Sequence, residues 1–133
     1  MDEALRGLLL GTTAIENVVG RRVDWGVRSQ GATLPSITLH HVSGVPQMHM
    51  AGPSGWNRAR IQIDSWGRTY KAASDLADVL GKSPGGLLVG FRGDLPGVRI
   101  RTFVIGRRSD DDVDGTDVVH RTSLDVMVWH TPL

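Results

Sequence analysis

The stretch RARIQIDSWGRTYKAASDLADVL, residues 58–80, decides the fold. Every second residue from 59 to 63 is apolar, whereas the residues between them are charged or polar, so a strand here would have one dry and one wet face. Such a strand is typical of an antiparallel sheet that is covered on one side. Over residues 70–80 the apolar residues recur at helical spacing, so we expect a helix that Thr69 caps and Gly81 ends.

The alternation of apolar and polar residues recurs along the chain, and shorter apolar stripes precede it. The predicted strands span residues 36–43, 57–66, 98–107 and 118–130. Before them we predict a short helix over residues 2–10 and a second short turn that Thr12 or Thr13 caps and Gly20 ends. We interpret residues 21–31 as an edge strand or an extended arm, 44–55 as a long Gly- and Pro-rich loop, and 109–117 as an acidic loop. The expected fold class is α+β: a single domain over residues 1–133, with a mostly antiparallel sheet of about four strands flanked by two or three helices.

The composition is that of one soluble globular domain: 133 residues, of which 40% are hydrophobic and 22% charged. The net charge of +1 predicts only weak overall attraction to nucleic acids or membranes. Because the chain has no cysteine, it has neither disulfides nor thiolate metal ligands. No apolar run is long enough to span a membrane, and Asp2 and Glu3 lie where a signal peptide would be basic. We therefore expect a protein that stays in the cytoplasm unless it leaves inside a larger particle.

The sequence lacks the motifs of common enzyme sites. The segment Gly81-Lys82-Ser83 is similar to the end of a phosphate-binding loop, but the glycine required five residues earlier is Leu76. His40 and His41 are adjacent, so in a strand they would point to opposite faces, and the other histidines lack the spacing of a metal-binding motif. We therefore predict that the protein is not an enzyme and that it holds no cofactor or metal.

A cluster of carboxylates lies just before the last predicted strand: Asp110, Asp111, Asp112 and Asp114. Alternating carboxylates ahead of a turn-forming Gly115 match the first half of a calcium loop, because the turn gathers oxygen ligands around one cation. The match then fails, since Arg121 occupies the position of the bidentate Glu and the flanks are predicted strands. We interpret the four aspartates as a solvated acidic loop or a charged interface. A cation site that serves a small metal-dependent hydrolase is the alternative.

The predicted loop before residue 57 carries flexible and aromatic contact groups: Met48, His49, Met50 and Trp56. Met adapts its shape to a partner, and Trp supplies a large contact area. We predict that these four residues contribute to an interface with a partner. The alternative is a loop that folds back over its own core.

Arginines mark the polar faces of the predicted strands: Arg58, Arg60, Arg99, Arg101 and Arg121. Sheet-type nucleic-acid modules interleave aromatic residues with such charges, because bases stack on aromatic rings. Here aromatic residues make up only 5% of the chain, and Asp64 and Asp125 interrupt the same faces. We therefore predict a salt-bridged outer sheet face, with a small nucleic-acid-binding domain as the alternative.

In the order and spacing of these elements the chain resembles the tail terminator proteins (tail-completion or head-to-tail joining proteins) of long-tailed phages and phage-derived gene transfer agents. The resemblance runs nearly end to end and rests on LRGLLL (5–10), LPSITLHHVSG (34–44), GPSGWNRARIQIDSWGRTYKAASDLADVL (52–80), GVRIRTFVIGRRSDD (97–111) and RTSLDVMVWH (121–130). The chain departs from the family at residues 81–93, where three glycines and Pro84 interrupt a helix that family members continue.

The resemblance implies a structural virion protein, assembled in the cytoplasm of a bacterial host and located at the tail–head junction of a phage or phage-like particle. Family members form a homohexameric ring on top of the tail tube. The ring stops polymerisation of the tail tube protein, presents a surface to the head–tail stopper or connector protein, and lets DNA pass through its lumen without sequence-specific binding. No membrane is involved. Another component of the same junction, such as the stopper, is the alternative within this class.

Overall fold

The computed structural model describes residues 1–26, 33–49, 52–83, 85–114 and 117–133, with the side chains at 44–49, 52–54, 112 and 114 outside the description. Its helices are α1 (Asp2–Leu10), α2 (Thr13–Val19) and α3 (Tyr70–Gly81). Its strands are β1 (Val23–Trp25), β2 (Ser36–His49), β3 (Gly52–Gly67), β4 (Arg92–Leu95), β5 (Val98–Asp114) and β6 (Asp117–Pro132).

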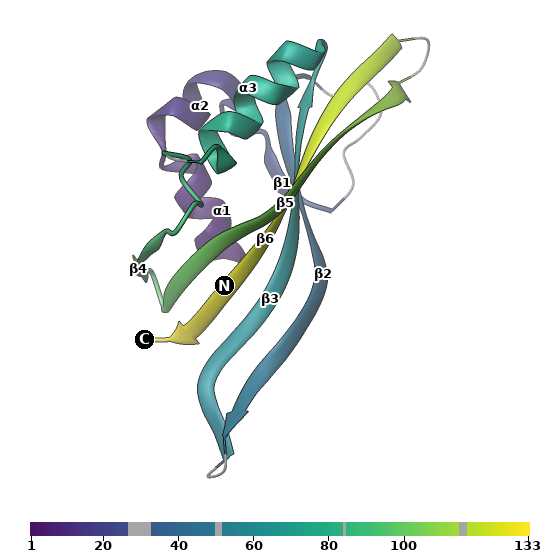
Figure 1. The fold of residues 1–133 in the computed structure, drawn as a ribbon. Coiled ribbons are helices and arrows are strands. Elements are labelled where there is room, and N and C mark those ends of the chain that lie inside the picture. Colours follow the sequence, from purple (N-terminus) through teal and green to yellow (C-terminus); the bar gives the residue numbers. More distant parts are fainter. Residues whose placement is uncertain (27–32, 50–51, 84, 115–116) are drawn as a thin grey trace.

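The six strands form one sheet in the order β1-β2-β3-β6-β5-β4. Strand β1 runs parallel to β2, and every other neighbouring pair is antiparallel. Figure 1 shows the three helices on the same side of this strongly twisted sheet. It also shows that the β2–β3 hairpin and the β5–β6 hairpin extend toward opposite ends of the molecule.

The expected fold class is wrong in its architecture. We expected an α+β domain with about four mostly antiparallel strands flanked by two or three helices, but the chain forms a six-stranded mixed sheet with three short helices on one face. Strands β1 and β4 have three and four residues, which are too few to show a period of two in the sequence. The parallel pairing of β1 with β2 leaves no signature in the sequence at all.

Two segments predicted as loops are largely strand. Strands β2 and β3 continue through most of residues 44–55, where Met48 pairs with Pro53, and β5 continues to Asp114 through the predicted acidic loop. Gly, Pro and Asp disfavour strands by only about 1 kcal/mol. A neighbouring strand that is already in place outweighs this preference, because it offers each residue main-chain hydrogen bonds.

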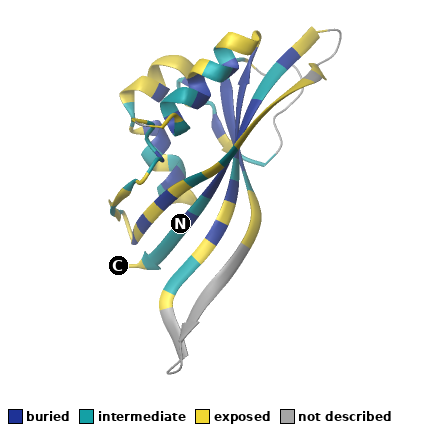
Figure 2. Ribbon diagram, viewed as in Figure 1, coloured by how far each residue is buried: buried dark blue, intermediate teal, exposed yellow. Residues whose placement is uncertain are grey.

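The core lies between the helices and the sheet face that they cover, as the burial colours in Figure 2 show. Ile61 and Ile63 of β3 and Leu124 and Val126 of β6 are completely buried there. The helices contribute Leu5, Leu9, Ile15, Val19, Ala73, Leu76, Ala77 and Leu80. Burying one Leu, Ile or Val side chain stabilises the fold by roughly 1.5–3 kcal/mol, so packing on the sheet holds these short helices in place.

The turn from β3 into α3 confirms the strand-to-helix transition expected from residues 58–80. The Thr69 hydroxyl accepts a hydrogen bond of 3.1 Å from the Ala72 N–H, and the helix ends at Gly81, both as expected. The last residue of β3 passes close to the helix, because a Cβ on Gly67 would lie 2.7 Å from the Ala73 nitrogen. Only glycine allows this approach without a shift of the backbone.

The segment after α3 folds back over the end of the helix. The N–H groups of Leu87 and Leu88 donate to the carbonyls of Val79 and Leu80 at 2.9 and 2.8 Å. These hydrogen bonds satisfy carbonyls that have no partner within the helix. The helix therefore stops at Gly81, as the glycines and Pro84 after it indicated.

Candidate functional site

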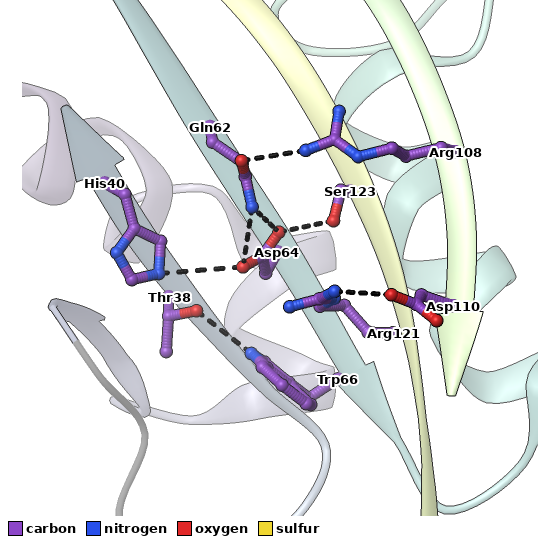
Figure 3. Close-up of polar contacts among 9 residues, drawn as sticks. All are labelled: Thr38, His40, Gln62, Asp64, Trp66, Arg108, Asp110, Arg121 and Ser123. Atoms are coloured by element: carbon purple, nitrogen blue, oxygen red, sulfur yellow. Dashed lines mark hydrogen bonds and ion pairs between the residues drawn. The ribbon is translucent and has the colours of Figure 1, made fainter. Parts of the chain in front are cut away.

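The sheet face opposite the helices is polar; we call it the outer face. Side chains alternate along each strand, so the residues next to buried Ile61 and Ile63 point away from the helices. Figure 3 shows the centre of the outer face, with contributions from β2, β3, β5 and β6. Its members are Thr38, His40, Gln62, Asp64, Trp66, Arg108, Asp110, Arg121 and Ser123.

A buried carboxylate, Asp64, lies at the centre of this face. Asp64 is 1% exposed. Its oxygens accept a hydrogen bond of 2.6 Å from the Ser123 hydroxyl and bonds of 3.0 and 3.2 Å from the Gln62 amide, and His40 Nε2 lies 3.6 Å away (Figure 3). These partners replace the water that the carboxylate loses on burial.

A second carboxylate, Asp125, binds two guanidinium groups. Asp125 Oδ2 lies 2.9 Å from Arg108 Nη1 and 3.2 Å from Arg60 Nη2. Arg108 also donates to the Gln62 amide oxygen at 2.8 Å, which links the Asp125 cluster to Asp64. The expected salt-bridged outer sheet face is confirmed at these positions.

The network continues toward the β5–β6 hairpin through an aromatic ring. Trp66 donates its indole N–H to the Thr38 hydroxyl at 2.9 Å, and the Arg121 guanidinium lies 5.4 Å from the centre of a Trp66 ring. Arg121 in turn donates to Asp110 Oδ2 at 2.7 Å (Figure 3). A hydrogen bond from the Asp111 N–H and, after it, the contact with Arg121 lower the pKa of Asp110 below its usual 3.8.

The other end of the outer face carries two arginines over tryptophans. The Arg58 guanidinium lies 5.7 Å from the centre of a Trp129 ring, and that of Arg101 lies 5.1 Å from the centre of a Trp56 ring. Within the described part of the chain, neither guanidinium forms an ion pair. These two guanidinium groups carry positive charge on the outer face that no carboxylate of the described residues offsets.

The predicted interface residues near the tip of the β2–β3 hairpin are only partly described. Met48 and His49 belong to β2 and pair with Pro53 and Gly52 of β3 in the backbone register, while Met50 lies outside the described residues. Trp56 is half-buried on β3 beneath Arg101. Their role as an interface therefore stays a prediction.

The predicted acidic residues lie at the opposite end of the sheet. Asp110 and Asp111 are exposed on β5, and Asp112 and Asp114 belong to the same strand, where they pair with Val119 and Asp117 in the register. The structure thus separates the Met- and Trp-bearing group from the acidic group, which lie on different hairpins. The acidic residues belong to a strand and not to a loop, and their part in an interface also stays a prediction.

Sequence reasoning did not identify Asp64 and Asp125 as organising residues of the outer face. It assigned both to a polar strand face, where a carboxylate is ordinarily solvated. The sequence does contain a signal for this cluster: two predicted strands each carry a pair of polar residues, Gln62 with Asp64 and Ser123 with Asp125. The signal can be used only when the two strands are known to be neighbours. Their burial follows from the pairing of β3 with β6, which only the structure shows.

The described residues contain no group of three or more His, Cys, Asp or Glu side chains that could hold a metal ion. Within the same residues, no helix is long and apolar enough to cross a membrane.

Comparison with known proteins agrees with the resemblance seen in the sequence. A model of the family described as tail completion protein gp17 matches residues 3–131. A chain of a solved structure titled "Virion of native gene transfer agent (GTA) particle" superposes with a TM-score of 0.69 at 16% identity, and the match covers 100% of this chain and 95% of that chain. At this identity the similarity shows a shared fold. The comparison with curated proteins gave no match. Because the family model spans nearly the whole chain, the protein belongs to the tail completion protein gp17 family, the structural proteins that complete a virion tail.

Proposed function

We propose that this tail-completion protein caps the tail tube as a homohexameric ring at the tail–head junction and joins the tube to the stopper or connector protein below the head. In this proposal DNA passes through the lumen of the ring without being read, and the protein catalyses no reaction. The observation that carries the proposal is the family match over residues 3–131, supported by a fold shared with a chain of a virion particle.

The electrostatics of the outer face are compatible with DNA that slides past. Arg60 and Arg108 are held by Asp125, and Arg121 is held by Asp110. A guanidinium that already binds a carboxylate contributes less to phosphate binding, and each avoided phosphate contact lowers the salt-dependent affinity for DNA. The overall net charge of +1 adds little attraction.

This function is tested by measuring the mass of the free protein and by imaging the protein mixed with isolated tail tubes. We expect native mass spectrometry and negative-stain imaging to show a six-copy ring, either free at high protein concentration or seated on tube ends. Addition of the protein to growing tubes should stop their elongation. A monomer or dimer that neither binds tube ends nor stops elongation would contradict the proposal.

A DNA-binding role is the second candidate, because Arg58 and Arg101 lack carboxylate partners among the described residues and lie over Trp rings. Such pairs can stack on bases and contact phosphates. A DNA-binding domain predicts micromolar affinity for duplex or single-stranded DNA that falls steeply between about 50 and 200 mM salt. A ring that only conducts DNA predicts no comparable binding by the free subunit. Fluorescence anisotropy with labelled oligonucleotides separates the two.

A further inference from the structure

One outer edge of the sheet belongs largely to β2. Strand β1 pairs with β2 only at residues 37–39. From His40 to His49 no other strand of the described chain covers this side of β2, although β3 pairs with its inner side. We call residues 40–49 the free edge of β2. Apart from Pro46, which has no N–H, its main-chain N–H and C=O groups that point outward are available to another strand.

The opposite edge belongs largely to β5. Strand β4 pairs with β5 at residues 98–101, and the Thr102 N–H donates to the Phe91 carbonyl at 2.9 Å. From Phe103 to Asp114 the outer side of β5 has no strand partner within the described part of the chain. We call residues 103–114 the free edge of β5. One sheet thus has two long free edges, one on each side.

Both free edges expose large apolar side chains. Val42 is 52% exposed on β2, and Phe103 and Ile105 are 48% and 50% exposed on β5. Val42 and Ile105 coincide with register shifts, where one strand has an extra residue. Charged residues protect the far part of the β5 edge, and a bulge interrupts each edge. The apolar side chains of Val42, Phe103 and Ile105 are nevertheless left in water, and we take this as the sign that a partner strand covers them in the assembly.

The geometry of the sheet identifies the partner as a second copy of this chain. Strands β2 and β5 run antiparallel to each other, because three antiparallel pairings connect them through β3 and β6. A copy rotated about a ring axis keeps its direction along that axis, so its β5 would lie antiparallel to β2 of its neighbour. A tube or connector protein would occupy one edge and leave the other uncovered. A second copy covers both, and the contact repeats around a closed ring.

We propose that the free edge of β2 in one copy pairs antiparallel with the free edge of β5 in the next copy, so that the sheets join into one continuous β-barrel wall. This inference rests on the proposed ring. The two free edges lie toward opposite ends of the sheet in Figure 1, so neighbouring copies are displaced along the strand direction. Closed barrels require such a displacement, because their strands tilt and their register is sheared.

Cysteine pairs test this contact, since the natural chain has no cysteine. The experiment combines Val42→Cys in turn with Phe103→Cys, Ile105→Cys, Ser109→Cys or Asp111→Cys, which sample possible displacements along β5. Two strands lie between β2 and β5, so Val42 and Phe103 of one copy are about 14 Å apart by three strand spacings, whereas a disulfide requires Cα atoms within about 7 Å. Every disulfide formed must therefore join two copies.

We expect at least one double variant to give a ladder of covalent oligomers up to six copies after mild oxidation of the assembled ring. Each single variant should remain monomeric on a non-reducing gel, because a head-to-tail contact never places a residue beside its own copy. Val42→Cys with Val18→Cys is the matched control, since Val18 is exposed on α2 and belongs to neither free edge. Cross-linking of single variants, or no ladder from any double variant of a protein that forms rings, would overturn the inference.

A second pair of variants gives an independent measurement. Val42→Lys places a charge on the free edge of β2 and should abolish the ring, whereas Val18→Lys should leave the ring intact. The two variants should have the same unfolding temperature, so that loss of the ring cannot be attributed to unfolding. Rings of Val42→Lys that match the wild type would overturn the edge contact while leaving the proposed function in place. A wild-type protein that forms no ring even at tube ends would instead overturn the proposed function, and the edge contact with it.

Discussion

Asp64 is the residue on which the outer face depends. An ionised carboxylate loses favourable hydration on burial, and at 1% exposure Asp64 retains almost none. The Ser123 hydroxyl and the Gln62 amide donate hydrogen bonds that replace this hydration. The amide oxygen of Gln62 in turn accepts a hydrogen bond from Arg108. A network of this kind fixes the register of β3 against β6, because a shift by one residue would separate Asp64 from Ser123.

We predict that Asp64→Ala lowers the free energy of unfolding by about 2–4 kcal/mol, because it leaves the buried Ser123 hydroxyl and the half-buried Gln62 amide without their acceptor. Urea denaturation followed by circular dichroism measures the change. Asp94→Ala is the control, since Asp94 pairs with Arg99 at the exposed surface and its loss should change stability far less. Equal effects of the two substitutions would show that the Asp64 network does not stabilise the fold.

A second residue-scale prediction concerns Gly67. An added Cβ would lie 2.7 Å from the Ala73 nitrogen and 3.0 Å from the Ala72 Cβ, so β3 and α3 must move apart. We expect Gly67→Ala to destabilise the protein by roughly 1–3 kcal/mol. Gly7→Ala, at an exposed position in the middle of α1 with nothing within 4 Å, should instead stabilise it by roughly 0.5–1 kcal/mol. Thermal unfolding of both variants measures these changes in stability. If Gly67→Ala leaves the unfolding temperature unchanged, the close packing of β3 against α3 is contradicted.

At this scale the sequence predicts which way side chains point but not how deeply they are buried. The alternation at residues 59–63 correctly places Ala59, Ile61 and Ile63 on the core side. It also places Gln62 and Asp64 on the polar side, but it cannot show that long neighbouring side chains cover Asp64. Burial on a polar face depends on cross-strand neighbours, and these are set by pairing and not by local sequence.

The stability of the β5–β6 hairpin should depend on acid. The pKa of Asp110 is lowered in the folded state, first by the hydrogen bond from the Asp111 N–H and then by Arg121. A carboxyl group with a lowered folded pKa contributes stability above its unfolded pKa of about 3.8, and this contribution is lost as pH falls through the lower folded value.

We therefore predict that Asp110→Asn is less stable than the wild type at pH 6 and that the difference shrinks as pH falls below about 4. Urea midpoints measured from pH 6 to pH 2.5 test this. Asp75→Asn serves as the control, because Asp75 is exposed on α3 and bonds only Lys71 among the described residues. A difference between Asp110→Asn and the wild type that grows toward low pH would contradict the sign of the shift.

Helices and strands whose apolar residues recur at a clear period could be predicted from the sequence. Strand segments that form only because they pair with a neighbouring strand could not. Helix α3 was predicted with its cap and its end because a full apolar stripe, Thr69 and Gly81 agree. The extension of β2, β3 and β5 into segments rich in Gly, Pro and Asp was not, because local propensity points the other way there. In these hairpins the tertiary pairing decides the structure.

For the whole molecule, the sequence indicated the role more reliably than the architecture. The order of soft motifs from residue 5 to residue 130 was enough for the resemblance, which the family match over residues 3–131 confirms. The same motifs did not give the number of strands, since β1 and β4 have three and four residues. The predicted interface residues on the two hairpins remain predictions, whereas the free edges of β2 and β5 became visible only once the sheet was assembled.

The proposed ring places specific demands on the whole molecule. Its subunits must use different surfaces toward each neighbour, and the two free edges meet this demand without any further domain. Its lumen must not hold DNA, and the pairing of Arg60, Arg108 and Arg121 with carboxylates reduces the attraction.

The most direct test of the central claim is negative-stain imaging of particles from a producer strain that lacks this gene. The account predicts DNA-filled heads separated from tails of uncontrolled length, and restoration of joined particles when the wild-type gene is supplied in trans. Normal tails joined to heads in the absence of the gene would contradict the proposed role.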